Sequence, residues 1–185
     1  MNTESTVSGS HARPPEDATT LVRRFAAAGA SRYDALVALG ELSPDTALPA
    51  LRRGLRDDDW HVRHWCAIAL DQLADADALA DLIDLLDDPH YKVRLWAVHS
   101  LACDHCKPGV EAPCDIVPLL IERAERDEHP RVRKMATVML AHQLIDERAL
   151  SLLRRKASRT DPGDDPKLRM HARQGLERYR EAGLG

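Results

Sequence analysis

The chain has 185 residues, of which 44% are hydrophobic and 30% charged, enough for one soluble domain with its own core. Only seven residues are aromatic, and alanine, leucine, arginine and aspartate dominate, so the composition favours helices over strands. No apolar run approaches the roughly 20 residues of a membrane span, and the net charge of −4 argues mildly against general binding to nucleic acid.

The N-terminal segment, residues 1–17, is polar and has no apolar stretch, so we expect a disordered tail and no secretory signal. The expected compartment is then the cytoplasm, where clustered cysteines are more often metal ligands or redox groups than structural disulfides. Residues 18–185 are expected to form a single domain. It opens with two segments, residues 20–29 and 32–42, that are predicted to cap its N-terminal end.

Four later segments repeat one another and align on a Val-Arg or Leu-Arg pair. They are DDDWHVRHWCAIAL (57–70), DPHYKVRLWAVHSL (88–101), DEHPRVRKMATVML (127–140) and GDDPKLRMHARQGL (163–176). Apolar or small residues recur at i, i+4, i+7 and i+8 from the Val or Leu, which is one face of a helix. Each segment is preceded by another amphipathic stretch; these are residues 44–55, 77–86, 114–124 and 147–157. The repeated unit is therefore predicted to be a helical hairpin, and Cys66, at a small core position, is predicted to be a buried, inert thiol.

An acid stands six residues before the arginine in three of the four segments. The pairs are Asp57–Arg63, Asp88–Arg94 and Asp127–Arg133, whereas Gly163 takes the place of the acid in the fourth segment, with Asp164 and Asp165 beside it. An aspartate in the turn and an arginine one turn into the second helix can pair between successive units. This pattern resembles the Asp/Arg ladder of HEAT repeats, especially the short bacterial form also seen in phycobilisome-lyase-like repeats, over about residues 44–181. The resemblance implies an all-α, right-handed solenoid of about four to five stacked hairpins, in which these pairs are structural.

The repeat interval changes once along the chain. Val62 and Val93 are 31 residues apart, whereas Val93 and Val132 are 39 apart. The extra length falls in a Cys-rich insertion at residues 103–114, between two predicted hairpins. Insertions on repeat scaffolds tend to lie on one face and to carry function.

The insertion and the helix before it contain the pattern H-x3-C-x2-C-x7-C, formed by His99, Cys103, Cys106 and Cys114. This set of ligands suits tetrahedral zinc, and His105 is a rival fourth ligand. Cys114 is expected to begin the next helix. A structural zinc would stabilise a loop that has little core of its own. The alternatives are a redox-active thiol pair, a catalytic or other metal, and no bound metal.

A second candidate site is the concave face, which the second helices of HEAT hairpins normally line. One row on this face is basic or histidine in all four units: His61, Lys92, Arg131 and Lys167. The next row holds Trp65, Trp96, Met135 and His171. A basic row beside large apolar side chains predicts a groove for an acidic peptide or a phosphate-bearing ligand. The alternative is that the tryptophans pack between hairpins and the basic residues are only solvated.

We therefore expect a non-catalytic HEAT-repeat scaffold that binds a protein partner on its concave face, with zinc fastening the Cys-rich loop. The sequence contains no GxSxG, P-loop, Rossmann glycine or HExxH motif. One alternative is a factor that handles a metal or cofactor, or assists lyase-like maturation, with the cysteines as a transient ligand site. Another is an enzyme similar to the HEAT-like alkylpurine DNA glycosylases, for which Asp71 is the nearest candidate carboxylate.

Overall fold

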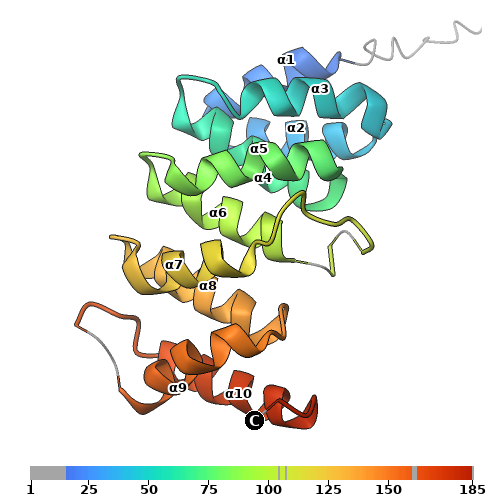
Figure 1. Cartoon of the computed structure of the whole chain (residues 1–185). Coiled ribbons are helices and arrows are strands. Elements are labelled where there is room, and N and C mark those ends of the chain that lie inside the picture. The colour runs from blue at the N-terminus through green and yellow to red at the C-terminus, as the bar shows by residue number, and fades with distance from the viewer. Residues whose placement is uncertain (1–15, 104, 107, 160–161, 185) are drawn as a thin grey trace, which may run out of the picture.

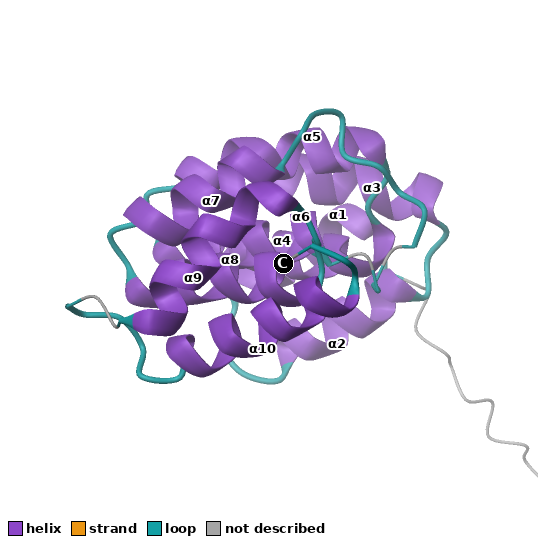
Figure 2. Cartoon of the chain, turned by 60° about the horizontal axis from the view of Figure 1, so that its bottom comes forward, coloured by secondary structure: helices purple, strands orange, loops and turns teal. Residues whose placement is uncertain are grey.

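The computed structural model describes residues 16–103, 105–106, 108–159 and 162–184, which form helices and loops without any strand (Figures 1 and 2). The α-helices in this part of the chain are α1 (Ala18–Arg23), α2 (Ser31–Gly40), α3 (Pro44–Gly54), α4 (Trp60–Leu73), α5 (Ala76–Asp84), α6 (Tyr91–Ala102), α7 (Val117–Arg126), α8 (Pro130–His142), α9 (Leu150–Ser158) and α10 (Leu168–Glu181). Short 3₁₀ turns at Arg24–Ala26, Leu85–Asp87 and Glu147–Ala149 adjoin α1, α5 and α9.

The helices pack in chain order as stacked hairpins, which confirms the predicted all-α architecture. Helices α3 and α4, α5 and α6, α7 and α8, and α9 and α10 form the four hairpins, and α1 and α2 cover the end at α3 and α4. The second helices α4, α6, α8 and α10 pack on one another in succession, so they form one continuous layer. None of the helices described is long and apolar enough to cross a membrane.

The repeated apolar positions form the core of this stack. The aligned Val62, Val93, Val132 and Leu168 are at most 2% exposed, and the small residues four positions later, Cys66, Ala97, Ala136 and Ala172, are fully buried. A Cβ atom on Gly54 would lie 2.4 Å from the Cys66 sulfur, so only glycine permits this approach of α3 to α4. Burial raises the pKa of the Cys66 thiol, which therefore stays protonated and inert, as its repeat position predicts.

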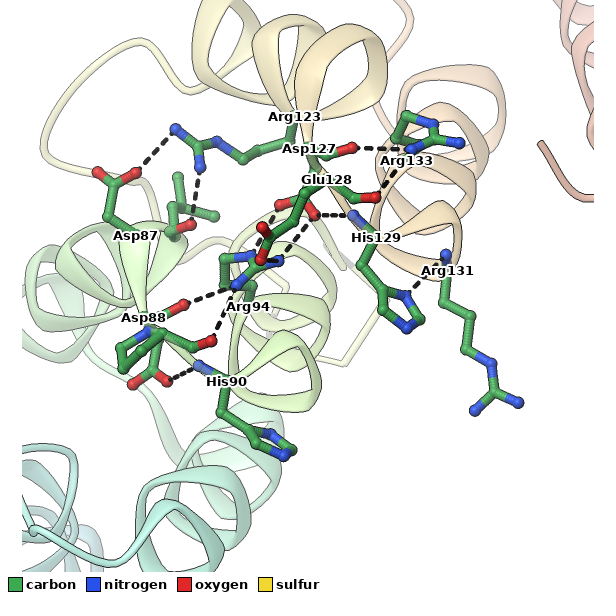
Figure 3. A network of polar contacts seen from close by, with 12 residues as sticks. Asp87, Asp88, His90, Arg94, Arg123, Asp127, Glu128, His129, Arg131 and Arg133 are labelled. Carbon is green, nitrogen blue, oxygen red and sulfur yellow. Dashed lines mark hydrogen bonds and ion pairs between the residues drawn. The ribbon is translucent and has the colours of Figure 1, made fainter. Parts of the chain in front are cut away.

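Ion pairs join successive hairpins at the turns that precede the second helices. The distances from the arginine Nε to the carboxylate oxygen are 2.6 Å for Arg63–Asp88, 2.8 Å for Arg94–Asp127 and 2.7 Å for Arg133–Asp164. Each arginine also donates to the backbone carbonyl of the aspartate six residues before it, within its own unit. In the unit where Gly163 replaces the acid, Asp164 supplies the carboxylate and also accepts a bond from the buried Lys156. Figure 3 shows Arg94 on α6, with bonds both to the Asp88 carbonyl of its own unit and to Asp127 of the next unit.

Two predicted boundaries differ from the observed ones. Helix α7 begins at Val117, so Cys114 lies in a bend before the helix and does not begin it. The helix starts here because Pro118 suits the first turn, where its missing N–H costs no hydrogen bond, and Asp115 accepts a bond from the Val117 N–H. Most of the expected tail, residues 1–15, lies outside the described residues, whereas Asp17 caps α1 by accepting a bond from the Thr20 N–H.

Candidate metal centre

Four side chains with metal-binding chemistry converge between α4 and the turn after α6. They are Asp71 from the last turns of α4, His99 from α6, Cys103 at the C-cap of α6, and Cys106 from the following turn. One ligand atom from each lies within 4.8 Å of all the others. Zinc bonds of about 2.0–2.3 Å place tetrahedral ligands about 3.3–3.8 Å apart, so small shifts of these side chains, with the two sulfur atoms moving apart from 2.9 Å, would enclose the ion.

The backbone of α6 explains why His99 and Cys103 lie together. They stand four residues apart on one helical face, and the Cys103 N–H donates to the His99 carbonyl at 2.9 Å, which closes the last turn. The sulfur atoms of Cys103 and Cys106 are 2.9 Å apart, because the chain turns back directly after the helix. His99 Nε2 lies 3.4 Å from Asp71 Oδ2, which orients the imidazole toward α4.

The electrostatics of Cys106 argue against a reactive thiol pair. The hydrogen bond with Cys103, burial, and the neighbouring Asp71 carboxylate together raise the pKa of Cys106 to about 12. A redox-active thiol needs a lowered pKa, because the thiolate is the nucleophile. A bound cation would supply the positive charge that this arrangement needs to ionise its thiols.

The structure brings together three of the four expected ligands. His99, Cys103 and Cys106 belong to the group, whereas Cys114 and the rival His105 are exposed and lie outside it. Asp71 completes the group in place of Cys114.

Asp71 had one sequence signal that could have identified it as a site residue. Nine positions after the aligned valine, units two and three carry Ala102 and Ala141, which are buried, and unit one carries this carboxylate. A carboxylate at a buried repeat position requires a partner.

The residues expected to bind a partner occupy three different environments. Lys92, Arg131 and Lys167 are exposed at the starts of the second helices. His61, Trp96, Met135 and His171 are half-buried, and the His61 ring stacks on Trp60 with centroids 3.7 Å apart. Trp65 is only 9% exposed because Phe25 and Tyr33 pack against it, so it contributes to the core beneath α2 rather than to an open surface.

Comparison with known families agrees with the helical hairpins in the first part of the chain. Residues 16–102 match the family model for HEAT repeats. Residues 16–102 consist of HEAT repeats. The match covers a little less than half of the chain, and the later HEAT-like hairpins continue the same stack. It includes Asp71 and His99 but ends before Cys103 and Cys106, so the family match does not account for the metal cluster. No curated protein matches the chain.

Proposed function

We propose that this chain is a non-catalytic HEAT-repeat scaffold that binds an acidic protein segment along the layer of second helices. We call the exposed side of α4, α6, α8 and α10 the second-helix face. We further propose that zinc, held by Asp71, His99, Cys103 and Cys106, fastens the Cys-rich loop to this scaffold. HEAT-type stacks suit such a role because a solenoid offers an extended surface to a chain-like partner.

The observation that carries the partner proposal is the exposure of cations at one repeat position. Lys92, Arg131 and Lys167 are exposed, and within the described part of the chain none of the three forms a salt bridge. Neighbouring acids are engaged elsewhere: Asp59 caps α4 and Asp165 pairs with Lys134 at 2.9 Å. Lys92 Nζ lies over the Trp60 ring, 5.1 Å from its centroid, and this contact leaves its charge unneutralised. The face therefore presents a row of positive charge without acidic partners, which attracts an acidic segment and sets its register.

The position of the cysteine cluster supports the zinc proposal. A metal ion there would join the end of α4 to the turn after α6, at the base of the insertion. The ligand set of one carboxylate, one imidazole and two thiolates is one that zinc accepts in tetrahedral geometry. Such a link would stabilise a segment that adds little apolar surface to the core.

A second candidate function, metal delivery, is favoured by the half-exposed Cys106 and by the use of a carboxylate ligand. Oxygen ligands hold zinc less tightly than thiolates do, so a site with only two cysteines exchanges its ion more readily. The exchange half-life distinguishes the two functions. Loss of zinc to a mild chelator within minutes supports delivery, and retention for hours supports a structural ion.

Charge reversal tests the partner proposal. In Lys92→Glu/Arg131→Glu, the affinity for a fluorescein-labelled peptide rich in aspartate and glutamate should fall about ten-fold or more, because attraction becomes repulsion. The matched control is Arg126→Glu/Arg154→Glu, which makes the same change in net charge at exposed positions of the first helices α7 and α9. Fluorescence anisotropy at low and moderate salt measures both.

The control distinguishes binding at the second-helix face from a general effect of net charge on binding. If both double variants lose the same affinity, only net charge matters and the second-helix face is not the binding surface. If wild-type protein does not bind the peptide even at low salt, the acidic-partner proposal is wrong.

A further inference from the structure

A cavity of about 490 Å³ lies beside the metal cluster, between α2, α4 and α6. Its walls are mostly apolar, with Leu36 from α2, Ile68 and Leu73 from α4, and Trp96 from α6. Asp71 belongs to both the cavity wall and the metal cluster. This volume falls within the range of about 300–1,000 Å³ that is typical of small-molecule sites.

The backbone makes this cavity electrostatically negative. Gly40, the last residue of α2, and Leu73, the last residue of α4, both line it. The C-terminal end of a helix carries about half a negative charge, because its last carbonyl groups have no partner within the helix. Two such ends therefore meet at one cavity, and both favour a cation.

The side chains add to this preference. Asp71 is 7% exposed, and none of the residues that line the cavity is lysine, arginine or histidine. The corner at Asp71 is negative in both metal states. With zinc bound, two thiolates and a carboxylate outweigh the divalent ion by one charge, and without zinc the Asp71 carboxylate keeps its own charge. A carboxylate also has enough lone pairs to contact the metal cluster and a cavity ligand together.

Trp96 supplies an aromatic wall whose orientation is held by two imidazoles. The rings of His64 and His99 lie steeply inclined to it, at interplanar angles of 73° and 69°, with centroids at 6.4 Å and 5.0 Å. The face of an indole attracts organic cations more strongly than other aromatic rings do. Apolar walls, one buried carboxylate and an indole are together the environment that an amine with an apolar body requires.

We propose that this cavity binds a small organic ammonium ion. Its apolar body packs against Leu36, Ile68 and Leu73, and its charged end lies against Asp71, Trp96 and the two helix ends. The site is separate from the basic row proposed to bind an acidic segment, and it does not depend on that partner. It also does not require zinc, because Asp71 contributes its charge in either state.

Three probes of similar shape test the proposal: 2-phenylethylamine, 2-phenylethanol and 3-phenylpropanoate. Binding is followed by the shift of the Trp96 indole N–H signal in ¹H–¹⁵N spectra, identified with Trp96→Phe, and zinc content is measured on each sample. We expect the amine to bind with a millimolar Kd, the alcohol about ten-fold more weakly, and the carboxylate not at all. Equal affinity for amine and alcohol, tighter binding of the carboxylate, or no binding of any probe would overturn the proposal.

Two variants test whether the Asp71 carboxylate is the charge that holds the amine. Asp71→Asn should weaken amine binding about ten-fold and leave alcohol binding unchanged, because only the ammonium interacts with the carboxylate charge. Asp84→Asn removes the same charge from an exposed position on α5 and should have no effect. If Asp71→Asn does not fold, Trp96→Leu replaces it and should weaken amine binding more than alcohol binding.

Metal-free protein separates this proposal from the zinc proposal. Cys103→Ser/Cys106→Ser should keep its affinity for the amine even though it loses zinc. Loss of amine binding in that variant would show that the cavity ligand depends on the metal cluster, which contradicts the inference but not the zinc proposal.

Discussion

Asp71 shows how one side chain acquires its role from its neighbours. Its repeat position is occupied by buried alanine in the next two units, so the helix face alone assigns it to the core. The carboxylate is tolerated there because His99 lies 3.4 Å away and the two cysteine thiols complete a polar cluster. Cys114, which has the chemistry but not the position, is exposed.

Single substitutions should show that Asp71 is a zinc ligand and that Cys114 is not. Asp71→Asn and Cys106→Ser should each lower the affinity for zinc about ten-fold or more, since each removes an anionic ligand. Cys114→Ser should retain wild-type zinc content, which elemental analysis of reduced protein measures. Loss of zinc in Cys114→Ser with retention in Asp71→Asn would restore the ligand set that the cysteine spacing predicts.

One type of side-chain to backbone bond recurs before the second helices, made by two kinds of side chain; it caps α4, α6 and α8, and it precedes the Lys167 N-cap of α10. Asp59, His90, His129 and Asp165 stand at the same repeat position, and each accepts a bond from the backbone N–H two residues later. A histidine can accept through Nδ1 only when that nitrogen carries no proton. The two rings also stack on aromatic residues of the preceding unit, His90 on Trp60 and His129 on Tyr91, with centroids 3.6 Å apart in both pairs.

These histidine caps should make the protein less stable in mild acid. Burial, followed by the charge of Lys92 or Arg131, lowers the pKa of His90 and His129 in the folded state. The unfolded chain therefore binds more protons below about pH 6.5, and stability present above that pH is lost as pH falls through the folded pKa. In His90→Asn/His129→Asn, the drop in Tm from about pH 7.5 to about pH 5 should be smaller, because asparagine caps without titrating.

The control for this measurement is His105→Asn, at an exposed turn position. It should reproduce the wild-type dependence of Tm on pH. An unchanged dependence in the double variant would show that other histidines dominate, such as His64, whose pKa burial lowers to about 4.

At the scale of the whole molecule, the ladder holds separate hairpins together as one stack. The Arg94–Asp127 pair has side chains only 5% and 1% exposed, and it spans the junction where the insertion lengthens the repeat. Arg94 also donates to the Asp88 carbonyl in its own unit, so one guanidinium joins two turns (Figure 3). In repeat stacks the interfaces between neighbours determine whether the chain unfolds as one unit.

Breaking this pair should destabilise the junction between the hairpin of α5 and α6 and the hairpin of α7 and α8. Arg94→Ala should lower the free energy of unfolding by about 3–5 kcal/mol, because it leaves the Asp127 carboxylate buried without its cation. Arg148→Ala, in a pair with Asp115 whose side chains are about half exposed, should cost less than about 1 kcal/mol. Urea unfolding followed by circular dichroism measures both, and equal losses would mean that burial does not control the strength of these pairs.

The sequence by itself determined the helices, the hairpins and their order of stacking. Each of these depends on spacing within a unit, and four copies of the unit repeat the same apolar positions. The arginines and aspartates of the ladder are also visible in the sequence, because the stack places the same turn of each unit beside the next.

Only the tertiary structure decided which residues complete the site. Asp71 belongs to the helix of the preceding unit and meets His99 because α4 packs on α6, which no spacing within the Cys-rich insertion reports. The same packing buries Trp65 under α2, leaves Trp96 on a cavity wall, and brings the ends of α2 and α4 together. Periodicity specifies the face of a helix, whereas the chemistry of a site depends on which side chains of neighbouring units share one space.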